Sequence, residues 1–250
     1  MKENKYDEAA FFDQYGKMAR SIGGLQSAGE WPEFEKLLPD LAGKDVLDLG
    51  CGYGWHCRYA VEHGARSAVG TDISEKMLAE ARSKTADSRI TYIQTAIEEI
   101  DFSPESFDLI LSSLAFHYVE FFEPVCARLY KLLRPGGNLV FSVEHPIFTA
   151  QGKQDWVYDD QGRKLHWPVD NYFLDGRRET LFLGHTVIKY HRTLTGYLDP
   201  LIHAGFSLQK IIEPKPSTEA LPRDESLHEE LRRPMMLLIA AHKAPLAQST

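Results

Sequence analysis

Long hydrophobic runs, paired cysteines and an excess of positive charge are all missing from this chain. No apolar stretch approaches the roughly 20 residues that a membrane-spanning helix requires, and the first residues, MKENKYDEAAFF, lack the hydrophobic centre of a secretory signal. The cysteines number only three, an odd count that does not suit a disulfide framework. We therefore predict a soluble, cytoplasmic protein that has no membrane partner.

The charge balance also narrows the range of partners. The formal net charge at pH 7 is −8, which repels nucleic-acid phosphates over long range, so we predict no nucleic-acid partner. His and Cys residues cluster between Cys51 and His63, but no paired ligand spacing recurs elsewhere, and no metal site is predicted. With 250 residues, the chain is long enough for one large domain with a substantial core.

The chain is organised around residues 46–54, which read VLDLGCGYG. A short apolar run ends in a turn with three glycines, Gly50, Gly52 and Gly54, and the residues from Trp55 to Glu62 can continue as a helix. Glycine has no Cβ, so the chain can adopt a positive φ there and a ligand can lie against bare backbone. The stretch predicts a strand, a tight turn that cradles a ligand, and a helix.

A second strand is predicted one βα unit later, from Ser67 to Thr71, and it ends on Asp72. A carboxylate at this place in an α/β sheet can accept hydrogen bonds from the two hydroxyls of a ribose. The dinucleotide fingerprint G-x-G-x-x-G would require a glycine at position 55. That residue is Trp55, and the third glycine is Gly54, which argues against a nicotinamide cofactor.

The G-x-G-x-G turn and the acid after the second strand resemble those of the class I S-adenosylmethionine-dependent methyltransferases, in particular the small-molecule group similar to ubiquinone-biosynthesis enzymes. Three later segments resemble that family in the same order: FDLILSS at 107–113, LRPGG at 133–137 and NLVFS at 138–142. The resemblance covers about residues 45–145. It implies an α/β fold with a doubly wound, mostly parallel, seven-stranded Rossmann-like sheet, whose last strand, Met235 to Ala241, pairs antiparallel at one edge.

The same resemblance implies that S-adenosylmethionine is the cofactor and S-adenosylhomocysteine the product. The implied cofactor-binding residues are Tyr15, Arg20, Asp48, Gly50, Cys51, Gly52, Gly54, Asp72, Ile73, Met77, Ile97 and Ser112. Tyr15 and Arg20 would meet the cofactor's carboxylate, since Arg suits that group, although a helical Arg is more often solvated. Many relatives carry an acid at the place of Ala96 that binds the adenine amino group; here the backbone around Ile97 and apolar contacts could hold the adenine, with Glu98 or Glu99 as nearby substitutes for that acid.

Two histidines are candidates for catalysis at the carboxyl edge of the sheet. His117 lies in the loop after the fourth strand, and His145 follows the fifth strand beside Pro146. The unperturbed pKa of histidine lies near neutrality, so either ring could take a proton from a nucleophile. Purely structural hydrogen bonding remains the alternative for both rings.

The resemblance and the chain length together predict four segments. Residues 1–44 form an N-terminal helical cap, with Phe11, Tyr15, Met18 and Ile22 at helical spacing. Residues 45–146 form the cofactor-binding core, residues 147–192 an inserted lid over the site, and residues 193–250 the rest of the sheet, all within a single domain. The lid is expected to contain hairpins, with turns at Asp159–Gly162 and Leu174–Gly176.

The sequence thus predicts an S-adenosylmethionine-dependent methyltransferase that moves a methyl group to an O, N or C nucleophile of a small molecule. It leaves open the identity of the acceptor, the use of a base, and whether the protein is a monomer or a homodimer. Two other functions stay possible at this point: a binding protein that has the same fold without turnover, and a nicotinamide-dependent oxidoreductase.

Overall fold

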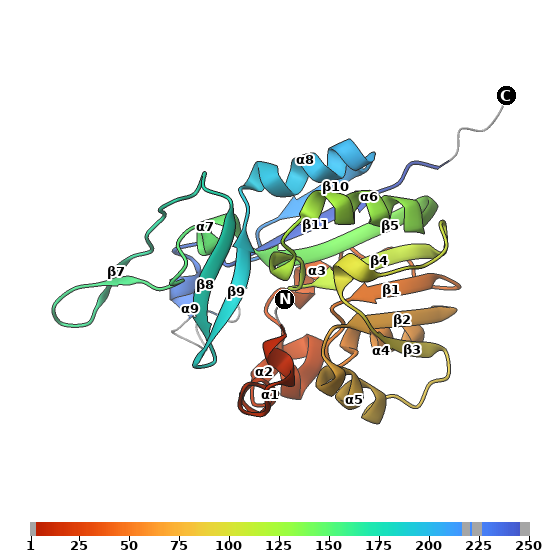
Figure 1. Ribbon diagram of the computed structural model, residues 1–250, viewed down its shortest axis with the longest axis horizontal. Coiled ribbons are helices and arrows are strands. Elements are labelled where there is room, and N and C mark those ends of the chain that lie inside the picture. Colours follow the sequence, from red (N-terminus) through yellow and green to blue (C-terminus); the bar gives the residue numbers. More distant parts are fainter. Residues whose placement is uncertain (1–3, 217–220, 222–226, 246–250) are drawn as a thin grey trace.

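The fold is built around one twisted sheet of seven strands (Figure 1). In this computed structural model, residues 4–216, 221 and 227–245 are described. The strands are β1 (Asp45–Leu49), β2 (Ser67–Asp72), β3 (Ile90–Gln94), β4 (Phe107–Ser113), β5 (Leu133–Glu144), β10 (Ser207–Ile212) and β11 (Met236–His242). Their order is β10-β11-β5-β4-β1-β2-β3. β11 pairs antiparallel with both β10 and β5, whereas the other neighbouring strands pair in parallel, so β11 lies inside the sheet and not at its edge as predicted. The predicted doubly wound, mostly parallel sheet is confirmed.

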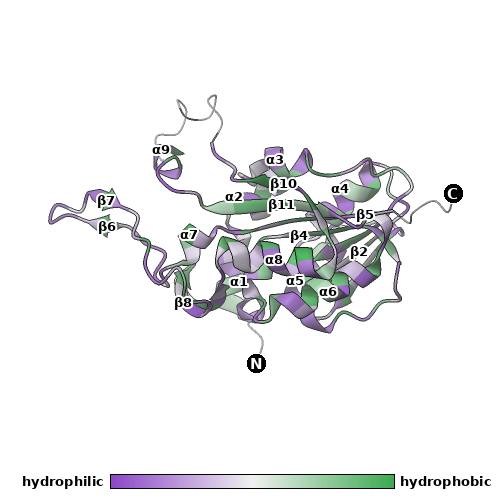
Figure 2. Ribbon diagram, turned by 90° about the horizontal axis from the view of Figure 1, so that it is seen from above, coloured by the Kyte–Doolittle hydropathy of each residue, from purple (hydrophilic) through white to green (hydrophobic). Residues whose placement is uncertain are grey.

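Helices cover both faces of this sheet, and the alternation of strand residues explains why. Val46 packs in a cluster with Trp31 and Cys57 on one face, whereas Leu47 packs with Leu129 and Leu201 on the other. The helices of the first face are α3 (Trp31–Glu35), α4 (Trp55–Glu62) and α5 (Glu75–Ser83); those of the second are α6 (Phe122–Leu132) and α8 (Leu194–Ala204). Figure 2 shows hydrophobic and hydrophilic residues alternating along these helices, as their packing on a sheet requires.

The N-terminal segment differs from the single amphipathic helix that the spacing suggested. It forms η1 (Lys5–Asp7), α1 (Ala9–Gly16), α2 (Ala19–Gly23) and η2 (Gly24–Ser27). Met18, between α1 and α2, has φ −66° and ψ 146°, an extended conformation. The chain therefore turns after Gly16, so that Phe11 is fully buried while Ile22 is 70% exposed. Helix propensity is low at Gly16, which explains why the helix ends there.

The insertion at residues 147–192 contains two hairpins and the short helix α7 (Pro146–Thr149) at its start. The strands β6 (Val157–Tyr158) and β7 (Lys164–His166) flank the predicted turn at Asp159–Gly162, and this hairpin projects away from the body in both ribbon views (Figures 1 and 2). The strands β8 (Gly176–Phe182) and β9 (His185–His191) are joined at Leu183 and Gly184, a turn that the sequence analysis missed. The predicted turn at Leu174–Gly176 leads into β8 instead.

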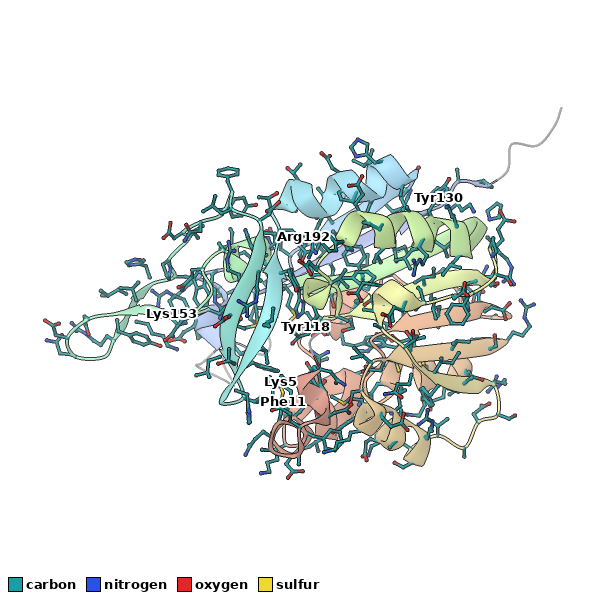
Figure 3. The ribbon with its side chains drawn as sticks, viewed as in Figure 1. Lys5, Phe11, Tyr118, Tyr130, Lys153 and Arg192 are labelled. Carbon is teal, nitrogen blue, oxygen red and sulfur yellow. The ribbon has the colours of Figure 1, made fainter. Side chains whose placement is uncertain are left out.

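The insertion and the N-terminal helices meet beyond the carboxyl ends of the parallel strands. The Phe11 ring lies 5.8 Å from that of Phe182 at the tip of the β8–β9 hairpin, and Figure 3 labels Phe11 and Tyr118 where these parts approach each other. Arg192, at the end of β9, donates hydrogen bonds to the carbonyl oxygens of Val119 and Glu120. The hairpin is thus fixed to the core at its base and contacts the N-terminal segment at its tip.

Candidate functional site

The turn between β1 and α4 presents bare backbone at the carboxyl edge of the sheet. Gly50, Gly52 and Gly54 have φ values of +70°, +52° and +71°, a region that favours glycine. An added Cβ would lie 2.5 Å from the Cβ of Ala115 at Gly50 and 2.1 Å from the Tyr92 hydroxyl oxygen at Gly54, but would meet nothing within 4 Å at Gly52. Gly50 and Gly54 therefore permit close packing, while Gly52 leaves open space.

Asp72 lies beside this turn, at the end of β2. Its two carboxylate oxygens accept hydrogen bonds from the backbone N–H groups of Gly52 and Ser74, each at 2.9 Å. Burial raises the pKa of Asp72 to about 6. A carboxylate has about four acceptor positions, so this group, ionised at neutral pH, can still accept hydrogen bonds from ligand hydroxyls. Ser74 also caps α5, because Ser74 Oγ accepts from the N–H of Met77 at 3.1 Å.

A cavity of about 530 Å³ lies at this edge, within the range of about 300–1,000 Å³ typical of small-molecule sites. The core supplies one wall, the N-terminal helices a second, and the insertion a third, with Phe148, Gln154 and Phe182 among its residues. The predicted site residues that line the cavity are Tyr15, Arg20, Gly50, Gly52, Asp72, Ile73, Met77, Ile97 and His117. Segments far apart in the sequence therefore converge on one space. Ala96 and Glu98 line it too.

The remaining predicted residues lie outside this cavity. Asp48 is buried beneath the turn, where its Oδ2 accepts from the Cys57 thiol at 3.6 Å and burial raises its pKa to about 8. Ser112 donates to the carbonyl oxygen of Leu49 at 2.8 Å. Gly54 packs on Tyr92, and Cys51 lines only a smaller recess beside the cavity. Direct contact with a ligand in the cavity is therefore not available to Asp48 or Ser112 in this arrangement.

A buried ion pair joins the insertion to the core at the far wall. The Lys189 ammonium, on β9, lies 2.5 Å from Glu144 Oε1, at the end of β5. Gln154 donates to Glu144 Oε2 at 2.7 Å and accepts from Thr180 at 2.8 Å. Burial alone would raise the pKa of Glu144, but the Lys189 ammonium, His117 and the hydrogen bond from Gln154 together outweigh burial, and the pKa is lowered. Lys189, Glu144 and Gln154 all line the cavity, so its inner wall is polar and charged.

His117 is buried beside this pair. Its Nδ1 accepts from the backbone N–H of Glu144 at 3.4 Å, which places the proton of the neutral ring on Nε2. Burial lowers the pKa of His117 to about 4, so the ring is neutral at pH 7. A ring that carries its proton on Nε2 is a hydrogen-bond donor at that nitrogen. The catalytic role predicted for His117 stays a prediction, and the geometry favours donation over proton abstraction.

His145 is not among the residues that line the cavity. Its Nδ1 accepts from the N–H of Ile147 at 3.0 Å, capping α7. Its Nε2 lies 2.8 Å from a carboxylate oxygen of Glu213. Both ring nitrogens are thus occupied by structural contacts. The catalytic role of His145 stays a prediction, and these contacts favour the structural alternative.

Several cavity residues were not found from the sequence. Ser113, rather than Ser112, lines the cavity, and strand alternation could have separated the two, since successive side chains point to opposite faces. Lys189 lies in a strand in which alternate residues, Val187, Lys189 and His191, are all buried. The same period-two spacing could therefore have indicated that Lys189 points inward. Glu30, Gln154 and Met236 also line the cavity, and no local pattern marks them.

Within the described part of the chain, no group of three or more His, Cys, Asp or Glu side chains is arranged to hold a metal ion. The described helices include none with the length and hydrophobicity needed to cross a bilayer.

The family profile of the methyltransferase domain matches residues 47–141. An uncharacterized protein of Haemophilus influenzae is 35% identical over 97% of this chain and 98% of its own length. A malonyl-[acyl-carrier protein] O-methyltransferase of Salmonella typhimurium is 33% identical over 83% of this chain and 80% of its own length.

Two solved structures are similar over most of this chain. A protein of Listeria monocytogenes, assigned as an S-adenosylmethionine-dependent methyltransferase, is 52% identical with a TM-score of 0.84, covering 88% of this chain and 99% of that one. An S-adenosylmethionine-dependent methyltransferase of Mesorhizobium loti is 43% identical with a TM-score of 0.82, covering 88% of this chain and 100% of that one.

Proposed function

The chain belongs to the S-adenosylmethionine-dependent methyltransferases, and within that family we propose that it methylates a small molecule held between the glycine turn and the β8–β9 hairpin. One observation carries the proposal: the cavity has the bare turn and Asp72 on one side and a wall built by the insertion on the other. The core, residues 45–146 and 193–250, would bind the cofactor. The cap, residues 1–44, and the insertion would enclose the acceptor.

The residues around the cavity fit S-adenosylmethionine. A Cβ at Gly52 would meet nothing within 4 Å, so the turn leaves room for a ligand against its backbone. We assign the ribose hydroxyls to Asp72, whose carboxylate keeps acceptor capacity, and the adenine to the segment from Thr95 to Glu98, which lines the cavity at the end of β3. Ile73 and Met77 supply apolar contacts there. Glu98 is the cavity-lining substitute for the acid missing at position 96.

Bound S-adenosylmethionine supplies a methyl group that is already activated for transfer by its sulfonium. The chain's task is then to align the acceptor with that methyl group and to exclude water, which accounts for most of the rate in such displacements. The β8–β9 hairpin and the N-terminal helices close two sides of the cavity. The His117 Nε2–H would orient the acceptor by donating to it. An acceptor atom that already bears a free lone pair at neutral pH needs no base, and the pKa values of His117 and Glu144 favour such an acceptor.

The acceptor would be a small molecule with both apolar and polar parts. Phe148, Phe182 and Met236 offer apolar contact area, whereas Lys189 and Glu144 offer a donor and an acceptor side by side. The opposite charges of the pair cancel, so the wall does not select strongly for an anion or a cation. O, N and C nucleophiles all remain compatible with this wall. A screen of acceptors should therefore begin with neutral, partly aromatic molecules.

A thermal-unfolding series tests the cofactor part of the proposal. A ligand at about 100 times its dissociation constant adds about 2.7 kcal/mol to the free energy of unfolding, which corresponds to a rise in midpoint of about 5–10 °C for a chain of this size. We expect this rise with S-adenosylmethionine and with S-adenosylhomocysteine, and none with NADH. A rise with NADH alone would refute the assignment of the glycine turn. Methyl transfer to a screened acceptor then tests the rest.

The pH dependence of cofactor binding tests the role of Asp72. The ionised carboxylate accepts ribose hydroxyls better than the neutral acid, and its pKa is about 6. The affinity for S-adenosylhomocysteine should therefore rise with pH up to about 6, by up to tenfold per unit, and be constant above it. Asp72→Asn should weaken binding at pH 7.5 by about tenfold to a hundredfold, the value of a charge-assisted hydrogen bond, and should remove the pH dependence. Calorimetric titrations between pH 5 and 8 measure both, and a flat profile for the unchanged protein would contradict the assignment.

A further inference from the structure

A small polar recess adjoins the cavity behind the glycine turn. It has a volume of about 60 Å³ and shares Arg20, Gly50, Gly52 and Ser113 with the main cavity. Water occupies a polar space of this kind at about 10–15 Å³ per molecule, so the recess can hold a group of a few heavy atoms. Ser21 and Trp55 are among its other lining residues, and the buried indole Nε1 of Trp55 has no hydrogen-bond partner among the described residues.

Arg20 lines both the recess and the cavity, and most of its guanidinium N–H groups make no hydrogen bond to a described residue. Its hydrogen bonds with described residues run from one terminal nitrogen, to Glu30 Oε1 at 2.9 Å and to Ser113 Oγ at 3.4 Å. An arginine fork binds a carboxylate through two parallel N–H groups, so the rest of the guanidinium is suited to a carboxylate. The Trp55 indole and the Ser21 hydroxyl are further donors on the recess side.

Glu30 is the unusual member of this group, because it is a carboxylate that is only 2% exposed. Its Oε1 is satisfied by Arg20 and by Ser113 Oγ, at 3.2 Å from the latter. Its Oε2 is buried and has no hydrogen-bond partner in the described part of the chain, although Glu30 lines the cavity. The terminal torsion of a Glu side chain is soft, so a small rotation can present this oxygen to a ligand. A donor that carries a positive charge would satisfy it best.

We infer that Glu30 is a direct ligand of the cofactor's α-ammonium group, while Arg20 and the donors of the recess hold its α-carboxylate. This inference rests on the cofactor site proposed above and adds to it a residue from the N-terminal cap. The site would then bind the ammonium group and the carboxylate of the cofactor's amino-acid end through different residues. It binds adenosyl ligands that keep that end and discriminates against those that have lost it.

Three adenosyl ligands, each with an uncharged thioether sulfur, separate the two contacts. S-adenosylhomocysteine has both the carboxylate and the ammonium group, its decarboxylated form has only the ammonium group, and methylthioadenosine has neither. Glu30→Gln should weaken binding of the first two by about tenfold to a hundredfold, the value of a hydrogen bond to a charged group, and leave methylthioadenosine within about twofold. Arg20→Met should weaken only S-adenosylhomocysteine by such a factor. Calorimetry on the full chain at pH 7.5 gives each dissociation constant without any methyl transfer.

Glu33→Gln is the matched control, because Glu33 lies in the first turn of α3, which begins directly after Glu30, and pairs with Lys36 at the surface. It should change none of the three constants. If Glu30→Gln weakens S-adenosylhomocysteine but not the decarboxylated ligand, Glu30 only positions Arg20 and the inference is wrong. Equal weakening of all three ligands would mean a general distortion of the cavity, which also overturns it.

The unchanged protein provides a test that does not depend on the variant folding. It should bind decarboxylated S-adenosylhomocysteine at least about tenfold more tightly than methylthioadenosine, the two differing only in the aminoalkyl end; equal affinities would overturn the inference. If both bind equally well, the adenosyl site stands and only the role of Glu30 is lost. If the folded protein binds none of the three ligands, the proposed cofactor site fails, and the inference fails with it.

Discussion

Gly52→Ala should remove the thermal stabilisation by S-adenosylhomocysteine while leaving the fold intact. At Gly52 an added Cβ meets no protein atom within 4 Å, so the methyl group would occupy space at the lining of the cavity. The cost to the free protein is that of an alanine at φ +52°, about 1–2 kcal/mol, or a few degrees in midpoint. The expected midpoint rise of about 5–10 °C with saturating ligand should disappear.

Gly136→Ala is the matched control for this substitution. Gly136 has φ +81° and open space around its missing Cβ, as Gly52 does, but it lies in β5 and does not line the cavity. Without ligand, the unfolding midpoints of the two variants should fall by similar amounts. With saturating ligand, the midpoint of Gly136→Ala should rise as in the unchanged protein, whereas that of Gly52→Ala should not. Gly54→Ala should instead destabilise the protein severely, because its Cβ would meet the Tyr92 ring. Normal ligand stabilisation of Gly52→Ala would show that the cofactor does not lie against the turn.

The strands of the core and the glycine turn could be predicted because their signals are local. Glycine spacing, the apolar runs and Asp72 lie within or next to single βα units, and their geometry follows from backbone sterics. Whether Asp48 and Ser112 reach the cofactor site depends instead on which face of its strand each side chain occupies. A strand alternates its side chains, so an error of one residue exchanges Ser112, bonded to Leu49, for Ser113, which faces the cavity.

The rest of the site could not be predicted because it depends on contacts across long separations. Glu30 meets Ser113 across 83 residues, and Lys189 meets Glu144 across 45. No local sequence pattern predicts which distant residue each of these side chains contacts. The break between α1 and α2 also escaped the periodicity, since Gly16 lowers helix propensity and the tertiary packing of Phe11 then sets the direction of the chain.

Lys189→Met should lower the free energy of unfolding by about 3–5 kcal/mol at pH 7, the cost of leaving one member of a buried ion pair without its partner. Lys189 is 3% exposed, and besides Glu144 it approaches Gln154 at 3.1 Å. Its removal leaves a buried carboxylate at the end of β5. Urea denaturation measures the loss. Lys36→Met, in an exposed pair with Glu33, should cost at most about 1 kcal/mol.

The pH dependence of the stability lost in Lys189→Met tests whether the unpaired Glu144 carboxylate causes that loss. In the unchanged protein the pKa of Glu144 is lowered, so its pair stabilises the fold above the unfolded value of about 4.3 and is lost as the pH falls through the lowered folded value. Without the ammonium, burial raises the pKa of Glu144 instead, and the variant becomes less stable as the pH rises from about 4.3. The difference between the two proteins should therefore be largest at neutral pH and shrink below about pH 5. Lys189→Met combined with Glu144→Gln should recover much of the lost stability at pH 7, because no charge is then buried. A loss of stability that is equal at all pH values would contradict this cause. It would mean that packing of the lysine stem, rather than its charge, holds the β8–β9 hairpin over the site.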